Sequence, residues 1–283
     1  MSDFEAPRYG QRAFRQEAPE CPRHPGRASI DYCKRCNRPM CLECAIPTEV
    51  RSICVDCAGQ LRQHFTRPSV TRGLIIACLA MFAVGWLLPK VQLAFLFMPA
   101  AGVYEPWRFL TAAFLHSGFM HLAFNMLALY WVGQSIEPIL GHAKFLALYL
   151  LSALGGSVAV LAWTFVNHTA WITATVGASG AVFGLFAAIF VLQKLSGSNT
   201  TAILVLLGIN LLYGFISPGI SWQAHVGGLL TGAAVTWVFM KLSRPKAGVT
   251  ARKQHAVTAL ATAAMAAVLI ALAVVCYLAL LTH

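Results

Sequence analysis

Charged residues are scarce in this sequence, and acidic ones almost disappear beyond its first quarter. Of the 283 residues, 11% are charged and 58% are hydrophobic, which excludes an ordinary soluble protein and indicates a polytopic membrane protein. No Asp follows Asp56, and beyond residue 73 the acidic residues are Glu105 and Glu137. The apolar region therefore lacks the carboxylate pair of an aspartyl protease and the relays of a proton-coupled transporter. It also lacks the HExxH motif of a zinc protease.

The positive charge of the chain is distributed in a way that does not favour nucleic-acid binding. The formal net charge is +11, but the Lys and Arg residues beyond residue 73 fall between apolar runs. Basic residues in such positions flank membrane spans. We therefore expect the lipid bilayer, and no nucleic acid, as a partner.

Several apolar stretches approach the length of about 20 residues that a membrane-spanning helix needs. The predicted fold is an all-α polytopic membrane protein preceded by a small cytoplasmic zinc-binding domain. The seven predicted spans cover residues 73–89, 117–136, 144–166, 177–195, 200–216, 223–242 and 255–281. The regions outside them are predicted to be a disordered N-terminus, a linker and a basic loop, at residues 1–20, 65–72 and 243–254.

The basic residues also predict an orientation. With seven spans, the loops on the side of the N-terminus hold Lys144, Lys194, Lys241, Arg244, Lys246, Arg252 and Lys253. Only Lys90 and Arg108 fall on the other side. Because basic loops stay in the cytoplasm, we expect a multi-pass plasma-membrane protein with a cytoplasmic N-terminus and an external C-terminus.

Seven of the nine cysteines lie between residues 21 and 57. With one histidine they form four pairs with two residues between the partners, a spacing typical of zinc ligands. The eight predicted ligands are Cys21, His24, Cys33, Cys36, Cys41, Cys44, Cys54 and Cys57. Disulfides are the alternative, but the first 70 residues show no signal peptide, and a reducing cytosol opposes them. Eight ligands suffice for two structural ions, and the spacing alone does not decide how the pairs combine.

Two polar residues open apolar helices in the membrane region. Ser179 lies between Gly177 and Gly180, and His225 precedes a run with spaced glycines. Small residues can serve close helix packing alone, but they also give a serine nucleophile room and nearby backbone N–H groups. In the predicted orientation, both side chains lie at a similar depth near the outer surface.

A second polar pair lies at the start of the second predicted span. His121 and Asn125 are four residues apart and therefore share a helix face. Polar groups inside an apolar helix usually mark a site or a buried hydrogen bond. His116, before this helix, is predicted to be a loop residue.

These motifs together resemble those of the rhomboid intramembrane serine proteases. The GxSG motif is matched by Gly177, Ser179 and Gly180, and the HxxxN motif by His121 and Asn125. The AHxxGxxxG motif is matched by Ala224, His225, Gly228 and Gly232. The WR pair is matched by Trp107 and Arg108. The resemblance covers residues 73–242 and implies a six-helix core, with residues 255–281 as an added seventh helix.

The resemblance also implies roles. Ser179 and His225 would form a catalytic dyad, and His121 and Asn125 would line the oxyanion hole. Gly177 and Phe183 would line the active site, with Phe183 stacked on the histidine. The expected function is an intramembrane serine endopeptidase that cleaves transmembrane protein substrates near the outer face. The alternative is a catalytically silent relative that binds such clients.

The N-terminal ligand pairs resemble the cross-braced B-box-type zinc fingers over residues 21–64. That resemblance implies one zinc ion held by Cys21, His24, Cys41 and Cys44, and a second held by Cys33, Cys36, Cys54 and Cys57. Since every ligand position is filled by protein, these zinc ions would be structural and would not take part in catalysis. Such a finger would offer a surface to an unidentified cytoplasmic protein partner.

Overall fold

The computed structural model of the chain describes residues 18–47, 52–58, 68–217, 219–243 and 251–282. The chain separates into two units, residues 1–65 and residues 66–283. The predicted disordered segment lies outside the described residues except for residues 18–20, of which Glu20 belongs to a strand. Residues 65–67 of the predicted linker and residues 244–250 of the predicted basic loop also lie outside them.

The described residues of the small N-terminal unit form three short antiparallel hairpins. The paired strands are β1 (Glu20–Cys21) with β2 (His24–Ala28), β3 (Asp31–Tyr32) with β4 (Pro39–Met40), and β5 (Ala45–Ile46) with β6 (Ile53–Cys54). Among the residues of this unit that the structure describes, the buried core consists of Met40 and six cysteines, Cys21, Cys33, Cys41, Cys44, Cys54 and Cys57. Strands this short bury little apolar surface of their own, so the buried side chains at the centre of this unit are mostly cysteines.

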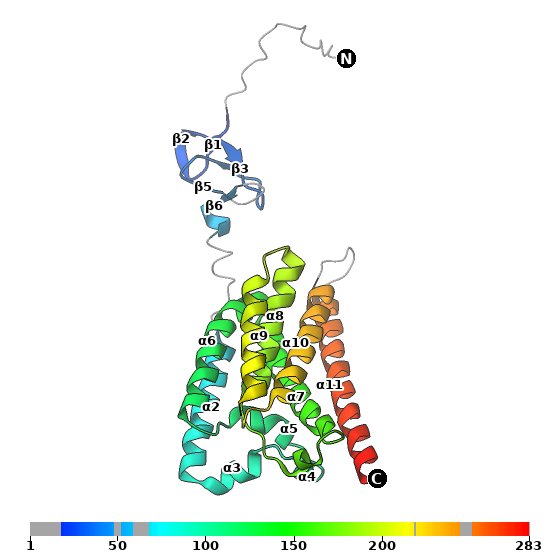
Figure 1. Cartoon of the computed structure of the whole chain (residues 1–283). Coiled ribbons are helices and arrows are strands. Elements are labelled where there is room, and N and C mark those ends of the chain that lie inside the picture. The colour runs from blue at the N-terminus through cyan, green and yellow to red at the C-terminus, as the bar shows by residue number, and fades with distance from the viewer. Residues whose placement is uncertain (1–17, 48–51, 59–67, 218, 244–250, 283) are drawn as a thin grey trace. The chain divides into compact units, whose positions relative to one another are not determined.

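The second unit is a bundle of long helices (Figure 1). They are α2 (Ser69–Leu87), α6 (Phe119–Leu140), α7 (His142–Trp163), α8 (Ser179–Ser196), α9 (Thr201–Ile216), α10 (Trp222–Leu242) and α11 (Ala251–Leu281). Shorter helices fill two connections: α3 (Pro89–Phe95), α4 (Pro99–Gly102), α5 (Arg108–Thr111) and the 3₁₀ turn η1 (Ala112–Phe114) before α6, and the 3₁₀ turn η2 (His168–Ile172) before α8.

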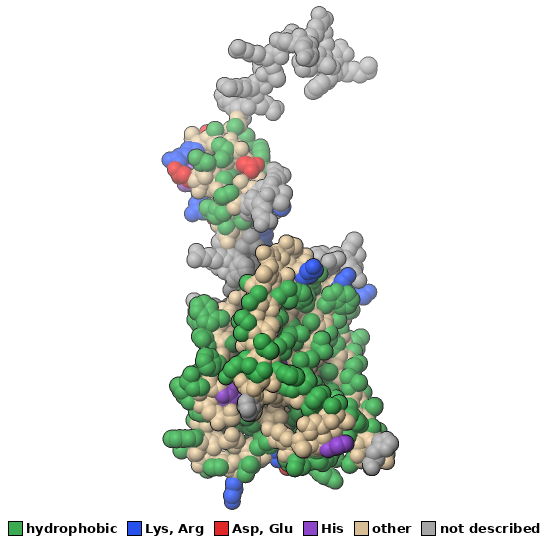
Figure 2. Space-filling view, in the orientation of Figure 1, with side chains coloured by type: hydrophobic (Ala, Val, Ile, Leu, Met, Phe, Trp, Pro, Cys, Tyr) green, Lys and Arg blue, Asp and Glu red, His purple; other side chains and the backbone are tan. Residues whose placement is uncertain are grey.

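Each predicted span corresponds to one long helix, and the predicted fold class is confirmed. Within the described part of the chain, five helices are long and apolar enough to cross a membrane. A sixth span results if Arg108–Phe114 and α6, bent by 93°, count as one. The predicted fifth span is α9, which at 16 residues is shorter than a typical span. Figure 2 shows hydrophobic side chains over the visible face of this unit and basic side chains at its two ends.

The first span begins earlier than predicted because a buried carboxylate holds its N-terminus. Glu137, at the end of α6, accepts hydrogen bonds from the N–H groups of Val70 and Thr71 at 2.9 and 2.8 Å. These N–H groups have no acceptor within their own helix. Residues 69–72, predicted as linker, are therefore the first turn of α2. Residues 251–254, predicted as part of the basic loop, likewise belong to α11.

The long connection between α2 and α6 is held by the predicted WR pair. Arg108 is buried and donates to the carbonyls of Leu93 and Leu96 at 2.6 and 2.7 Å. It also forms an ion pair with Glu105, and Trp107 donates to the Ala94 carbonyl at 3.1 Å. This connection therefore folds back on itself through side-chain donors and backbone acceptors.

Helices α8 and α10 pack so closely that their backbones are in direct contact. A Cβ atom on Gly228 would collide with the Gly180 carbonyl, and one on Gly232 would collide with the backbone of Gly184. Without an apolar driving force between helices in lipid, such close packing holds a bundle together. The two helices that carry Ser179 and His225 are thus set against each other by glycines.

We predict that Gly232→Ala destabilises the bundle. Over-packing of a tight contact costs about 1–3 kcal/mol, and each kcal/mol lowers the Tm of a chain of this size by about 2–4 °C. Gly208→Ala in α9 is the matched control, because a Cβ there meets no atom within 4 Å. Thermal unfolding of both variants in detergent measures the difference. Equal Tm values would contradict the glycine contact.

Candidate active site

Ser179 and His225 face each other at the same end of the bundle. Ser179 is the first residue of α8, and His225 lies in the first turn of α10. The Nε2 atom of His225 lies 2.9 Å from the Ser179 Oγ atom. The imidazole is buried, with 6% of His225 exposed, whereas Ser179 is half-buried. A hydroxyl that a substrate can reach therefore contacts a ring nitrogen that can accept its proton.

Packing holds the His225 ring in place. Phe183, one turn after Ser179, stacks on it with ring centroids 4.1 Å apart and planes inclined by 13°. On the other side, a Cβ on Gly214 of α9 would lie 3.1 Å from His225 Nδ1. Nδ1 has no hydrogen-bond partner among the described residues. The ring is thus oriented by a stacked aromatic side chain and a closely packed helix. None of the carboxylates that the structure describes is hydrogen-bonded to Nδ1.

The His121 ring packs against Gly177, two residues before Ser179. A Cβ on Gly177 would lie 2.8 Å from the His121 Cε1 and Nε2 atoms, and Gly177 has a φ of +134°. Only glycine combines that backbone conformation with this close approach. The Ser117 hydroxyl lies 3.0 Å from His121 Nδ1, so Nε2 is the ring nitrogen on the side of Gly177.

Asn125 lies one helical turn beyond His121 on α6. Its side chain is buried, and its Nδ2 atom donates to the His121 carbonyl at 2.8 Å. This bond ties the Asn125 side chain to its own helix and uses one of the two N–H groups of the amide. The structure brings Ser179, His225, Gly177, Phe183 and His121 together, whereas it gives Asn125 no direct contact with Ser179.

Two residues of the loop before α6 were not assigned to the site from the sequence. His116 lies in this loop, but it is buried with 3% exposed, and its ring lies edge-on to His121 at 5.2 Å. Neither nitrogen of His116 has a partner among the described residues. Ser117 fixes His121, as described above. The HSGFMH run offered a signal, since it places a second histidine and a hydroxyl just before His121.

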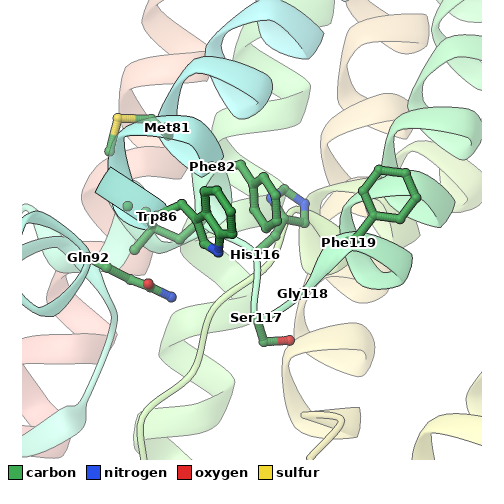
Figure 3. Close-up of a pocket in the computed structure, with 10 residues that line it drawn as sticks. Met81, Phe82, Trp86, Gln92, His116, Ser117, Gly118 and Phe119 are labelled. Carbon is green, nitrogen blue, oxygen red and sulfur yellow. The ribbon is translucent and has the colours of Figure 1, made fainter. Parts of the chain in front are cut away.

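A cavity of about 410 Å³ lies beside this loop. Its walls come from α2 and from the loop before α6, with the Phe82, Trp86 and Phe119 rings and the His116 side chain around it (Figure 3). Gln92 and Ser117 add polar atoms. The cavity therefore adjoins His116, whose ring contacts that of His121.

The backbone next to Ser179 supplies further polar groups. The first N–H groups of a helix have no intrahelical acceptor and carry the positive end of the helix dipole. Because Ser179 begins α8, this end of the helix favours a negative oxygen formed at the serine. The arrangement can carry out nucleophilic attack and stabilise an oxyanion.

The N-terminal unit holds two candidate metal centres. Its ligand atoms converge in two groups, each with all members within 4.8 Å of one another: Cys21, His24, Cys41 and Cys44, and Cys33, Cys36, Cys54 and Cys57. This is the cross-braced arrangement, in which each group combines two ligand pairs that are not neighbours in the sequence. His24 Nδ1 lies 3.2 Å from the Cys41 sulfur, and the Cys36 and Cys54 sulfurs lie 3.7 Å apart. Tetrahedral zinc with Zn–S bonds of about 2.3 Å places sulfurs about 3.8 Å apart.

Electrostatics in the first cluster also suit a cation. Hydrogen bonding from the Cys41 backbone lowers the pKa of the Cys21 thiol to about 6. Burial, together with the neighbouring Cys21 and Cys41 sulfurs, raises the pKa of Cys44 to about 11. Ionisation of one thiol thus disfavours ionisation of its neighbour, and a bound cation would relieve this repulsion. All nine cysteines are free of disulfides.

The fold and the serine–histidine contact define a polytopic helical membrane protein with a polar site at one end of its bundle. Residues 104–242 match the Rhomboid domain. The chain is 32% identical over 139 residues to the putative rhomboid protease YdcA of Bacillus subtilis, covering 47% of this chain and 67% of that protein. The chain belongs to the rhomboid family.

Two further relatives show how far the likeness extends. The rhomboid protease GluP of Bacillus subtilis is 38% identical over 149 residues, and RHOMBOID-like protein 5 of Arabidopsis thaliana is 34% identical over 152 residues. Each match covers 51% of this chain, but only 27% of GluP and 47% of the Arabidopsis protein. The domain match does not include residues 21–64, so their likeness to B-box fingers stays a prediction.

Proposed function

We propose that this protein is an intramembrane serine endopeptidase that cleaves transmembrane protein substrates. The observation that carries the proposal is the 2.9 Å contact between His225 Nε2 and Ser179 Oγ. The names of GluP and YdcA, a rhomboid protease and a putative one, agree with it. A silent client-binding relative is less favoured, because such a protein has no need of a serine and a histidine in hydrogen-bond contact.

In the proposed reaction, His225 takes the proton of the Ser179 hydroxyl, and the serine oxygen attacks the substrate carbonyl. His121 Nε2 and the N–H groups at the start of α8 stabilise the resulting oxyanion, with the free amide N–H of Asn125 as a further donor. His225 then donates its proton to the leaving amine. Water hydrolyses the acyl-enzyme, and the proton returns to the dyad.

Substrate entry is proposed beside α9. This helix is short, and its side chains Tyr213 and Phe215 are 61% and 65% exposed. The sequence predicts a mobile loop at residues 215–222, because Pro218 and Gly219 do not favour a regular helix. Of these, Pro218 lies outside the described residues. A substrate helix must unwind before cleavage, because its amides are otherwise hydrogen-bonded and shielded.

We further propose that the protein lies in the plasma membrane with a cytoplasmic N-terminus and an external C-terminus. The distribution of basic residues supports this orientation. Lys144 lies in the first turn of α7, and Lys194 and Lys241 lie in the last turns of α8 and α10. Ser179 and His225 lie at the opposite ends of their helices, so cleavage is proposed near the outer face.

Covalent labelling tests the proposed dyad. A fluorophosphonate probe is expected to label the full chain in detergent, and Ser179→Ala is expected to abolish the labelling. His225→Ala is expected to slow it by at least about a hundredfold, because general-base catalysis typically contributes 10²–10⁴-fold.

Ser135→Ala is the matched control for labelling, since Ser135 is an exposed serine of α6. It should label as the natural chain does. Labelling that persists in Ser179→Ala would point to another serine and overturn the assignment.

For the N-terminal unit we propose two structural zinc ions, one in each cluster. Zinc suits these residues because seven cysteines and one histidine supply two complete sets of four ligands. When bound, the metal would cross-link the three hairpins, which lack an apolar core of their own. The unit would then offer exposed side chains such as Leu42 and Ile30 to a cytoplasmic protein partner.

Elemental analysis of the full chain tests this composition. Two zinc ions per chain are expected, and Cys33→Ser is expected to lower the ratio to about one, because a missing ligand opens the second cluster. Cys276→Ser, in α11, is the control and should keep both ions. A ratio of one or less in the natural chain would contradict the two-site proposal.

A further inference from the structure

The last helix makes a polar contact with the long connection between α2 and α6. Tyr277 lies near the end of α11, and its hydroxyl donates to the Pro99 carbonyl at 2.9 Å. Its ring packs edge-on against Phe109 at 6.2 Å and against Trp171 at 6.1 Å. Most of the apolar side chains of α11 are exposed. The Tyr277 contact is therefore a specific anchor on a helix that otherwise packs lightly.

Pro99, which Tyr277 contacts, lies next to a pair of backbone hydrogen bonds between Phe97 and Thr175. Pro99 begins α4, two residues after Phe97. The N–H of Phe97 donates to the Thr175 carbonyl at 3.0 Å, and the N–H of Thr175 donates to the Phe97 carbonyl at 2.7 Å. Phe97 is fully buried, and its ring lies 4.6 Å from that of Phe109, the same ring that Tyr277 contacts. Tyr277 and this pairing thus share one packed cluster.

The segment paired with Phe97 leads directly into the active site. Gly177 follows Thr175 by two residues, and its N–H donates to the Ala112 carbonyl at 2.9 Å. The His121 ring lies over Gly177, and Ser179 follows two residues later. The position of residues 175–178 therefore affects where the Ser179 N–H and oxygen lie relative to the His121 ring.

We propose that Tyr277 is a positioning residue for the reaction at Ser179. By fixing the Pro99 carbonyl, it holds Phe97, and through Phe97 it holds the segment from Thr175 to Gly177 in register with the oxyanion donors. The seventh helix thereby contributes to turnover without contacting the reacting atoms. This inference rests on the proposed protease function.

Gly102 provides an independent way to break the anchor. A Cβ on Gly102 would lie 2.5 Å from the Tyr277 hydroxyl and 3.1 and 3.2 Å from the Phe109 and Phe97 rings. Glycine therefore leaves the space that the hydroxyl occupies. Gly102→Ala displaces the tyrosine without removing it.

The experiment compares Tyr277→Phe, Gly102→Ala and the control Tyr104→Phe as full chains in detergent. Tyr104 lies in the same connection and is 85% exposed. The active fraction is counted by end-point fluorophosphonate labelling, and kcat and KM for a transmembrane reporter are expressed per labelled site. Thermal unfolding is measured in parallel.

Tyr277→Phe is expected to lower kcat about three- to tenfold, as the loss of one hydrogen bond would, while KM stays within about twofold. Gly102→Ala should lower kcat at least as much, and Tyr104→Phe should match the natural chain. An unchanged kcat per labelled site in Tyr277→Phe would overturn the inference, as would a lower Tm as the only effect. If the natural chain is not labelled at all, the proposed function fails, and the positioning role fails with it.

Discussion

The structure depends on one close contact, the backbone-to-backbone packing of α8 against α10. Gly180 and Gly184 of α8 leave room for Gly228 and Gly232 of α10, and any side chain at the latter two positions would push the helices apart. Ser179 and His225 open these same helices, so the 2.9 Å distance between them follows from the packing below. In a bilayer, where apolar side chains gain little by leaving lipid, such packing is what holds helices in register.

The proposed dyad lacks a carboxylate among the described residues, and packing takes over the orienting role. Phe183 stacks on the His225 ring, and Gly214 lets α9 approach the Nδ1 atom. His121 is fixed in turn by the Ser117 hydroxyl. The site is thus organised by aromatic and small residues of the bundle, which fits a region almost without acidic side chains.

Much of this arrangement could be predicted from the sequence, because membrane spans and short motifs are local patterns. The helices and the candidate residues Ser179, His225, Gly177 and Phe183 were identifiable in this way. The 93° bend before α6 and the bond from Asn125 to the His121 carbonyl were not, since both depend on the folded loop. Burial of His116 and the pairing of the candidate metal ligands likewise depend on residues brought together only by folding.

If Ser179 is the nucleophile, the reaction passes through a covalent acyl-enzyme on its side-chain oxygen. The most direct measurement is acid quenching of the full chain during turnover of a transmembrane reporter, followed by peptide mass spectrometry. An ester is expected between the N-terminal substrate fragment and the peptide that contains Ser179. Cleavage without such an ester, or an ester on a different residue, would show that Ser179 is not the nucleophile.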